Sequence, residues 1–535
     1  MEKRALLAVV LSLIVLVLYQ QWLGWQYGTP ESPAPPVPEA KKPVVPEPAR
    51  PAAPPKAAAA ERPVPQEARE LTVETDRYMA VFTSRGARLK SFQFKDYRSS
   101  AHEKSPPFDI VSPSPALPLP LGVTWIGAPA GGDADVNYEV EGSSVRLSGE
   151  QQAALTFRGR AGDGTTITKT LVFTGGSYPI RLEVSAVNPA GAAVPLQVLL
   201  TAPADQAVRN PDAPFEGLVA LVDNKIKREH VADPLKEEKA FSGDVAWAGF
   251  GYTYFFIALL PESGGKHSVT LGQSGPALVL SVAPQPARDA ARYTLFIGPK
   301  DLSVLEAIGK GLERSIDFGY FAFISIPLLY VLHFFHRFTA SYGIDIILLT
   351  VLIKILTAPL THKSYVSMKQ MQRLQPQMER LKEKFKDDRE KLNKEIMELY
   401  RRNGVNPLGG CLPMLLQFPV FIGLYNALST PIELRHAPFL WIKDLSRPDW
   451  ESLPFTVGGW HLGVPVLTIL MGASMFIQQW MTPSAGDPNQ RKMMLMMPLM
   501  FTFMFVTFPA GLTIYWLVNN ILSIGQQWWI NRMDK

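Results

Sequence analysis

Cysteine is almost missing from this chain, because Cys411 is the one thiol among its 535 residues. A single thiol cannot close an intramolecular disulfide or build a cysteine-rich metal site. A domain outside the cytoplasm must therefore fold by packing alone, which a segment as long as 71–305 can do. Cys411 lies at the edge of an apolar run without a neighbouring base, and this fits a small buried hydrophobe better than a nucleophile.

Groups of residues typical of catalysis are also scarce. The polar middle of the chain has no cluster with metal-ligand spacing, no nucleophile elbow and no phosphate-binding loop. His333 and His336 are close enough in sequence to share a metal, but no third ligand is near them. We therefore expect a protein that is not an enzyme and that holds no cofactor or metal.

Apolar residues make up 47% of the chain and are unevenly spread. They concentrate at the extreme N-terminus and after about Gly319, with a long polar stretch between. This distribution predicts a membrane protein with one large domain outside the bilayer.

The N-terminal segment 1–28 begins with basic residues, continues with an apolar run and ends with Tyr19, Trp22 and Trp25. A cleavable signal peptide has a similar start, but no small-x-small cleavage site follows and the aromatic residues suit a membrane interface. We predict an uncleaved transmembrane anchor with a cytoplasmic N-terminus. The range 29–70 is rich in proline and alanine and predicts a semi-rigid linker.

The range 71–305 is predicted to form a large β-sandwich in the periplasm. Ile180, Leu182 and Val184 alternate with polar residues, which is the period of a half-buried strand. Glycine- and proline-containing turn signals punctuate such stretches at short intervals, as at Asp163-Gly164 and Asn188-Pro189.

Charge decides the expected membrane topology. The range 361–407 carries more Lys and Arg than Asp and Glu, and the positive-inside rule assigns it to the cytoplasm. This holds only if the apolar segment 318–337 does not span, so we predict that 306–340 forms an interfacial amphipathic helix on the outer face. Six transmembrane helices and a cytoplasmic C-terminus follow, with spans in 1–28, 343–360, 409–429, 463–482, 493–508 and 511–530.

Lys354 is the most informative residue of the membrane core, which we place at 341–535. It lies about 10 Å along its helix from Thr361, the expected cytoplasmic end of the span. A charge at that depth costs at least ~2.5 kcal/mol, so it should face protein or water. Two interpretations remain open: the side chain reaches to the cytoplasmic headgroups, or it lines a hydrated cavity open to the cytoplasm. Asp345 is about 13.5 Å away along the helix, too far to neutralise the charge.

The cytoplasmic loop has apolar residues at helical spacing. One stripe begins at Met368, and a second follows Asp387-Asp388. The pattern predicts an antiparallel helical hairpin in 361–407. Its charged faces fit simple solvation, and they also fit contact with ribosomal RNA or anionic lipid.

The stretch from about Thr350 to Gln527 closely resembles the YidC/Oxa/Alb family of membrane protein insertases, in particular its bacterial branch. Five motifs carry the resemblance: Ala-Pro-Leu-Thr at 358–361, Gln-Pro at 375–376, Asn-Pro-Leu-Gly-Gly-Cys-Leu-Pro at 406–413, Gln-Phe-Pro-Val-Phe at 417–421 and Phe-Pro-Ala-Gly-Leu at 508–512. The order of anchor, linker, β-domain, interfacial helix and five-span core also matches Gram-negative members.

The resemblance implies an insertase that moves hydrophobic segments from the cytoplasm into the inner membrane through a hydrophilic groove. Lys354 falls where many relatives have arginine, with Thr350 and Trp516 lining the groove and Phe421 and Met504 on a hydrophobic slide. The polar residues Gln417 and Asn519 of later spans are expected to join the groove. Implied partners are nascent membrane proteins, the Sec translocon, the ribosome and the lipid bilayer, without DNA or a cofactor.

Two other functions are weighed against this interpretation. A transporter that binds an anionic solute at Lys354 predicts internal repeats, and we see none in the sequence. A sugar-processing β-domain requires paired carboxylates in a cleft, which the sequence does not place.

Overall fold

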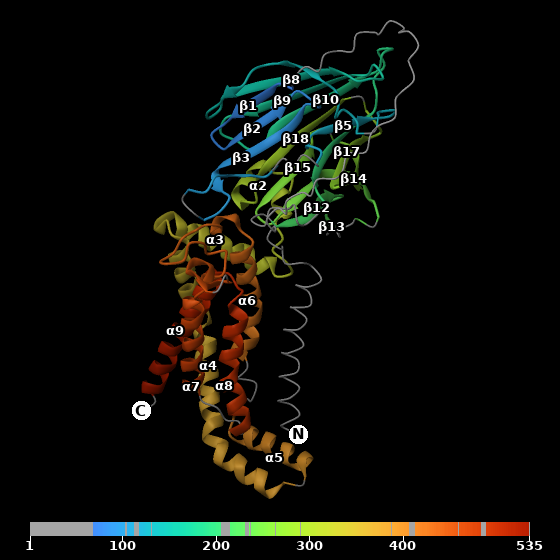
Figure 1. Cartoon of the computed structure of the whole chain (residues 1–535). Helices are drawn as coiled ribbons and strands as arrows, with labels where there is room; N and C mark the ends of the chain where they lie inside the picture. Colours follow the sequence, from blue (N-terminus) through green and yellow to red (C-terminus); the bar gives the residue numbers. More distant parts are fainter. Residues whose placement is uncertain are drawn as a thin grey trace, which may run out of the picture. The chain divides into compact units, whose positions relative to one another are not determined.

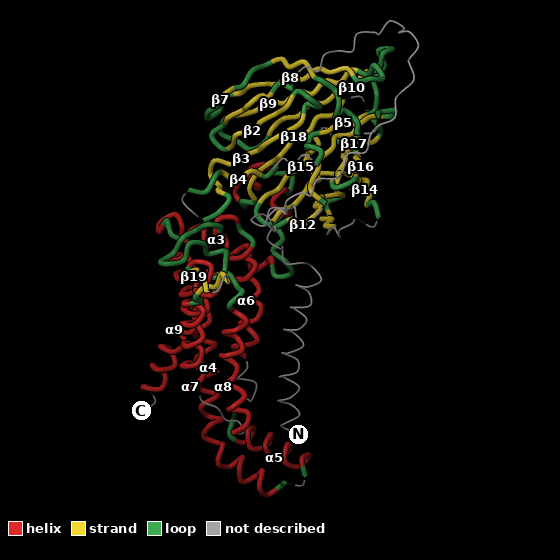
Figure 2. Tube along the Cα trace, viewed as in Figure 1, coloured by secondary structure: helices red, strands yellow, loops and turns green. Residues whose placement is uncertain are grey.

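The structure is a computed structural model that describes residues 68–533, apart from 102–103, 112–116, 130, 205–213, 230–234, 236, 263, 289, 387, 406–411, 458–459 and 483–487 (Figure 1). The predicted anchor at 1–28, nearly all of the linker at 29–70, and Cys411 lie outside the described residues. Described strands are concentrated in the first half of the chain and helices in the second (Figure 2).

The first of two large sheets has the order β4-β3-β2-β1-β7. Its side chains alternate between buried and accessible positions along β1 and β2, as period-two strands do. The strands are β1 (Glu70–Glu74), β2 (Tyr78–Thr83), β3 (Arg88–Arg98), β4 (Pro107–Asp109) and β7 (Val145–Arg146).

The second sheet has the order β5-β11-β17-β16-β14-β15-β18-β10-β9-β8-β6, with β12 and β13 attached beside β14. Its strands are β5 (Gly122–Trp125), β6 (Tyr138–Glu141), β8 (Gln152–Arg160), β9 (Thr166–Thr174), β10 (Ile180–Val187), β11 (Leu196–Pro203), β12 (Phe215–Val222), β13 (Lys225–Glu229), β14 (Lys239–Tyr252), β15 (Phe255–Pro261), β16 (Lys266–Ser274), β17 (Ala277–Gln285) and β18 (Ala290–Pro299).

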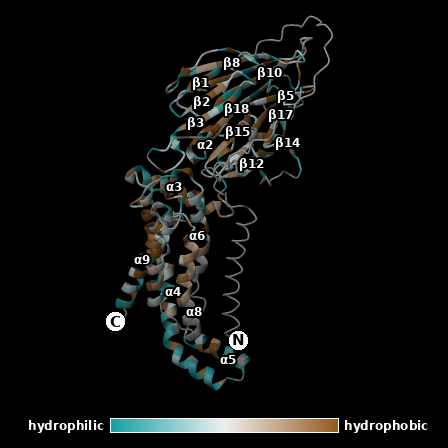
Figure 3. Ribbon diagram, viewed as in Figure 1, coloured by the Kyte–Doolittle hydropathy of each residue, from teal (hydrophilic) through white to brown (hydrophobic). Residues whose placement is uncertain are grey.

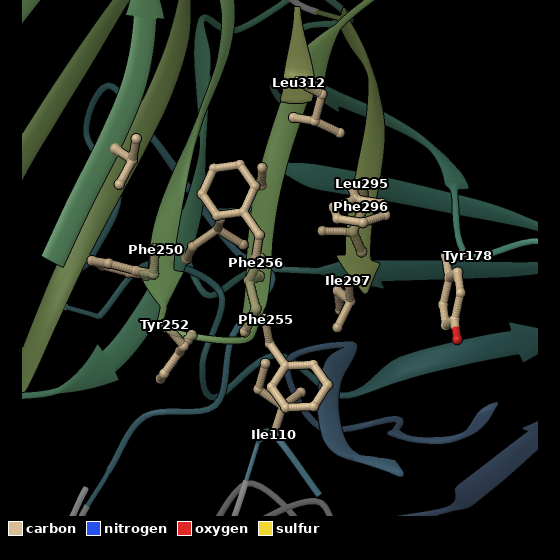
Figure 4. Packing of buried hydrophobic residues seen from close by; sticks show 14 of the residues in the cluster. Ile110, Tyr178, Phe250, Tyr252, Phe255, Phe256, Leu295, Phe296, Ile297 and Leu312 are labelled. Carbon is tan, nitrogen blue, oxygen red and sulfur yellow. The ribbon is translucent and has the colours of Figure 1, made fainter. Parts of the chain in front are cut away.

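Aromatic side chains join the two sheets. Phe82 of β2 contacts Phe173 of β9 with ring centroids 5.6 Å apart, and Phe94 of β3 stacks on Phe255 of β15 at 4.7 Å. Figure 4 shows part of this core, where Phe255 and Phe256 of β15 lie among buried residues of neighbouring strands. The predicted β-structure is therefore present as two packed sheets, and β10 buries Ile180, Leu182 and Val184 as their alternation predicts.

The second half of the described chain is mainly helical. Its helices are α2 (Leu302–Ile308), α3 (Ala322–Thr339), α4 (Tyr342–Lys384), α5 (Arg389–Arg402), α6 (Leu412–Ser429), α7 (Val466–Met481), α8 (Pro488–Phe505) and α9 (Ala510–Met533). Short elements fill the connections: η2 (Leu312–Ser315), η4 (Ile432–Leu434), η5 (Asp449–Ser452) and the hairpin of β19 (Pro454–Val457) with β20 (Trp460–Gly463).

Two helices in the described part of the chain are long and apolar enough to cross a membrane, α3 and α4, and shorter apolar helices occur at Val466–Met481 and Leu495–Phe505. The count of six spans therefore stays a prediction. The interfacial placement of 306–340 also stays a prediction, because α3 has the length and composition of a span.

Contacts between the helices give the directions of three of them. Two hydrogen bonds join α4 to α9, namely Lys354 to Ser523 and Thr361 to Gln526. Two more join α7 to α9, namely Ser474 to Asn520 and Met481 to Gln527. Along each pair the residue numbers rise together, so α4, α7 and α9 run in the same direction.

Helix α4 continues through the residue where we expected a span to end. Pro359 lies inside it, and the expected span 343–360 and the first helix of the loop are one helix of 43 residues. Apolar helices tolerate proline where nearby hydroxyl groups engage the local carbonyls. Thr357 donates to the carbonyl of Ile353 at 2.9 Å, and Thr361 donates to that of Thr357 at 3.0 Å.

The end of α4 pairs with α5 through a small apolar cluster of its own. Leu374, Met378, Tyr400 and Val405 are buried there, and Tyr400 Oη donates to Met378 Sδ at 3.2 Å. Asp388 caps α5 by accepting from the backbone N–H of Lys391 at 3.0 Å. The apolar stripes of the loop thus pack on each other, and α5 presents mostly hydrophilic residues (Figure 3).

Candidate functional site

Lys354 is half-buried on α4, and its ammonium group is bonded to α9. Nζ donates to Ser523 Oγ at 2.6 Å. Ser523 Oγ in turn donates to the backbone carbonyl of Asn519 at 2.7 Å. The structure gives Lys354 no ion-pair partner among the described residues, so a positive charge lies between two helices beside a neutral hydroxyl.

The acid nearest to Lys354 along α4 is engaged elsewhere. Asp345 is fully buried, and its carboxylate accepts from His336 Nδ1 at 2.7 Å and from the hydroxyl of Thr339. His333 contacts a different carboxylate, that of Glu433, at 3.0 Å. The two histidines thus have separate partners, and the described ranges contain no group of three His, Cys, Asp or Glu suited to a metal.

Thr350 lies one turn before Lys354 on α4 and is buried. Its hydroxyl donates to the carbonyl of Ile346 at 2.6 Å, so it is engaged within its own helix. The structure therefore places Thr350 beside the charge without showing a contact between them.

Polar and aromatic candidates on α6 and α9 lie together. Gln417 Nε2 donates to Tyr515 Oη, which ties α6 to α9. Trp516, the next residue, has its ring 5.2 Å from that of Phe421 on α6 and 5.1 Å from that of Phe505 on α8. The structure brings Trp516 and Phe421 into one aromatic cluster of Phe421, Phe501, Phe505 and Trp516. Their expected roles, Trp516 in the groove and Phe421 on the slide, stay predictions.

This aromatic cluster and the charge occupy different levels of α9. Trp516 precedes Ser523 by seven residues, about 10 Å along the helix axis. Seven residues are close to two helical turns, so both residues lie on the same side of α9. Asn519 lies between these levels, and its backbone carbonyl accepts the Ser523 hydroxyl.

Met504 lies on an exposed apolar face of α8. Its side chain is 41% exposed, and the neighbouring positions of the same face are also apolar and exposed: Met496, Leu499, Met500 and Phe503. This face follows the helical spacing of three and four residues. Met504 is thus available to lipid or to an apolar segment, whereas Phe421 is partly covered.

Several polar residues of the site were not identified from the sequence. Ser523 bonds Lys354, and Gln526 bonds both Thr361 and the carbonyl of Ala358 at 3.2 Å. The sequence does contain a signal, because Asn519, Ser523 and Gln526 recur at helical spacing in a mostly apolar segment. That spacing marks one face of α9, and this is the face that meets α4.

The family models agree with this division of the chain into strands and helices. A model described as YidC periplasmic domain matches residues 70–331, and one described as 60Kd inner membrane protein matches 334–535. Membrane protein insertase YidC of Pelobacter propionicus is 42% identical over all of this chain and 99% of the relative. The chain belongs to the YidC family of membrane protein insertases.

Other members of the YidC family match over nearly the whole chain. Those of Syntrophus aciditrophicus and Geotalea daltonii are 40% and 38% identical, each over 99% of this chain and at least 99% of the relative. A solved YidC insertase with its first transmembrane domain resolved covers 85% of this chain and 91% of its own, with 18% identity and a TM-score of 0.37.

The family assignment confirms several expectations from the sequence. The chain is a membrane protein insertase, it has a periplasmic domain of mainly β-structure, and it is not an enzyme, since its relatives are named insertases. The transporter alternative receives no support from these relatives. The roles of individual residues are not tested by the assignment.

Proposed function

We propose that this chain moves hydrophobic segments of newly made proteins from the cytoplasm into the inner membrane and assists their folding, alone or with the Sec translocon. The observation that carries the proposal is the ammonium group of Lys354, held within an apolar helix by a neutral partner. A charge without a counter-ion at that depth is costly, so its presence points to a function.

The first step uses the charged level of the core. A short hydrophilic tail of the substrate enters beside Lys354, where polar groups of α4 and α9 replace part of its hydration. The relevant side chains are Thr357, Thr361, Ser523 and Gln526. Replacing water by such groups lowers the cost of moving a polar segment into the membrane. Acidic residues of the tail are attracted to the uncompensated ammonium group.

The second step uses the apolar surfaces next to the site. The hydrophobic segment passes Phe421 and the aromatic cluster, and it leaves along the exposed face of α8 that contains Met504. Flexible thioether side chains such as Met500 and Met504 suit a surface that accepts segments of varied shape. Burial of apolar surface in lipid, about 25 cal/mol per Å², supplies the driving force.

The topology that this mechanism requires has six spans, cytoplasmic termini and a cytoplasmic hairpin in 361–407. The parallel directions of α4, α7 and α9 support it, since these are alternate spans of the proposed core. The exposed basic residues of the hairpin, such as Arg373 and Lys394, fit a cytoplasmic location and contact with the ribosome.

The function is tested by insertion of a short single-span protein into proteoliposomes that contain only the full chain, measured by protease protection. We expect protection above that of empty liposomes, and loss of most of it in Lys354→Ala because the attraction for the tail is gone. Lys354→Arg should retain insertion, since the charge is kept. Lys363→Ala is the matched control, because Lys363 is exposed on the same helix.

Two results would count against the proposal. Protection no better than empty liposomes, from chain shown to be folded, would mean that the chain does not insert substrates by itself. Equal insertion by wild type and Lys354→Ala would keep the insertase activity but remove Lys354 from the mechanism.

A further inference from the structure

The hydrogen bond between Lys354 and Ser523 has a defined direction. A serine hydroxyl has one hydrogen and two lone pairs. Ser523 directs its hydrogen to the carbonyl of Asn519 at 2.7 Å, so its lone pairs remain for the ammonium group at 2.6 Å. The hydroxyl thus acts as a fixed acceptor, and two N–H groups of Lys354 remain for other partners.

A neutral acceptor has a different effect from a carboxylate. It satisfies one N–H group of the ammonium and fixes its position, and it leaves the positive charge uncompensated. A carboxylate at position 523 would satisfy the same N–H group and also cancel the charge that an acidic substrate segment experiences. The pairing found here combines a fixed position with a full charge.

We propose that Ser523 is the positioning residue of the insertase site: its hydroxyl holds the Lys354 ammonium on the α4–α9 seam with its charge available to acidic residues in the translocated tail of the substrate. This rests on the proposed function and deepens it, because it makes the preference for acidic tails depend on a residue of α9. Ser523 itself carries no charge and attracts no substrate.

Neighbouring hydrogen bonds keep α9 in place independently of Ser523. Gln526 donates to the carbonyl of Ala358 at 3.2 Å, one turn further along α4, and Gln527 bonds to the carbonyl of Met481 on α7. Removal of the Ser523 hydroxyl should therefore release the ammonium group without separating the helices. This makes the role of Ser523 testable by substitution.

The chain offers a matched control in Ser474 of α7. Its hydroxyl donates to the carbonyl of Met471 at 2.6 Å and accepts from Asn520 Nδ2 of α9 at 3.0 Å. Ser474 thus makes the same pair of bonds as Ser523, with a neutral amide in place of the ammonium group. Ser474→Ala removes an interhelical hydrogen bond of α9 without touching Lys354.

The experiment measures insertion of two substrates by the full chain in proteoliposomes, one with an acidic and one with a neutral translocated tail. Ser523→Ala should lower insertion of the acidic-tail substrate by about threefold to fifteenfold, the range expected for one interhelical hydrogen bond in a membrane. The neutral-tail substrate should be unaffected. Ser523→Thr, which keeps the hydroxyl, should restore the preference for acidic tails, and Ser523→Asp should abolish it.

The same assay separates positioning from simple helix packing. In a Lys354→Gln background, Ser523→Ala should have no further effect, because no ammonium group remains to be held. Two outcomes would overturn the proposal. The first is that Ser523→Ala lowers insertion of both substrates equally, which is the pattern expected of Ser474→Ala if that variant has any effect. The second is that Ser523→Ala lowers insertion further in the Lys354→Gln background. If Lys354→Gln leaves insertion of both substrates unchanged, the ammonium group has no role and the positioning proposal fails, while the insertase activity itself stands.

Discussion

Buried cations of this chain are stabilised in two different ways. In the β-domain, Lys169 is almost fully buried, with Nζ 2.5 Å from Asp133 Oδ2 and 2.8 Å from the carbonyls of Gly86 and Leu121. Arg88 reaches the other oxygen of Asp133 at 2.7 Å. Lys354 in the membrane core has a serine hydroxyl instead. The first arrangement compensates the charge, and the second leaves it uncompensated, as our proposal for Lys354 requires.

Replacement of Asp133 should therefore destabilise the β-domain strongly. Asp133→Asn leaves two buried cations without their shared carboxylate, and breaking a buried pair in this way costs about 3–5 kcal/mol. Thermal unfolding of the full chain in detergent, followed by circular dichroism, measures the loss. Asp135→Asn is the control, because Asp135 pairs with Arg85 at the exposed surface, and little change is expected. Equal melting of the two variants would show that the cluster contributes nothing.

The same carboxylate gives a pH dependence with a defined sign. Burial opposes its ionisation, but the charges of Lys169 and Arg88 hold the pKa of Asp133 below its usual value of 3.8. Its contribution to stability is present above pH 3.8 and is lost as the pH falls through the lower pKa of the folded state. The difference in melting temperature between wild type and Asp133→Asn should thus narrow as the pH falls below 3.8. A constant difference would contradict this.

Lys354 could be selected from the sequence, because a single charge within an apolar run can be recognised without a structure. Its partner Ser523 was missed, because the partner lies 169 positions later and only packing of α4 against α9 brings the two together. The role of Trp516 in the groove stays a prediction. Trp516 was assigned to the groove by position in a family pattern, whereas its contacts depend on how three helices pack.

The structural elements were predictable to the extent that their signals are local. Alternation predicted the burial pattern of β10, and the apolar stripes predicted the pairing of α5 with α4. The continuity of α4 was not predicted, because the span was expected to end near Thr361 and the hairpin was treated as a separate element. The order of the strands within the sheets was also not predictable, since β10 pairs with β18, which lies about a hundred residues away.

The pairing of α4 with α5 should depend on Tyr400. This residue is 9% exposed and packs on Met378, so Tyr400→Ala removes the largest side chain of a small cluster. Large-to-small substitutions of aromatic core residues cost about 3–5 kcal/mol of folding free energy. A cluster of this size should not hold α4 and α5 together after such a loss. We expect faster proteolysis between α4 and α5, measured by limited digestion and mass spectrometry. Lys394→Ala, on the exposed side of α5, should leave the digestion pattern unchanged. Equal digestion of both variants would mean that the helices do not depend on this cluster.

At the scale of the whole molecule, the distribution of charge and hydrophobicity predicts which parts face which compartment. The strands of the β-domain contribute many buried apolar residues to the core, and one cysteine cannot close an intramolecular disulfide. The net positive charge of the loop from 361 to 407 opposes its export. The family assignment places a domain in the periplasm but leaves the side of the hairpin open. The topology is thus a prediction that rests on the loop charge and on α3 not spanning.

Labelling with a membrane-impermeant thiol reagent tests that topology. In a Cys411→Ser background, Lys225→Cys on the exposed strand β13 should react in intact spheroplasts, because the β-domain faces the periplasm. Lys394→Cys on α5 should react only after permeabilisation, because a basic loop is retained in the cytoplasm. The cysteine-free background, which should remain unlabelled, is the control. Reaction of Lys394→Cys in intact spheroplasts would mean that α3 crosses the bilayer. The charged site next to α9 would then open to the periplasm, and substrates could not reach it from the cytoplasm.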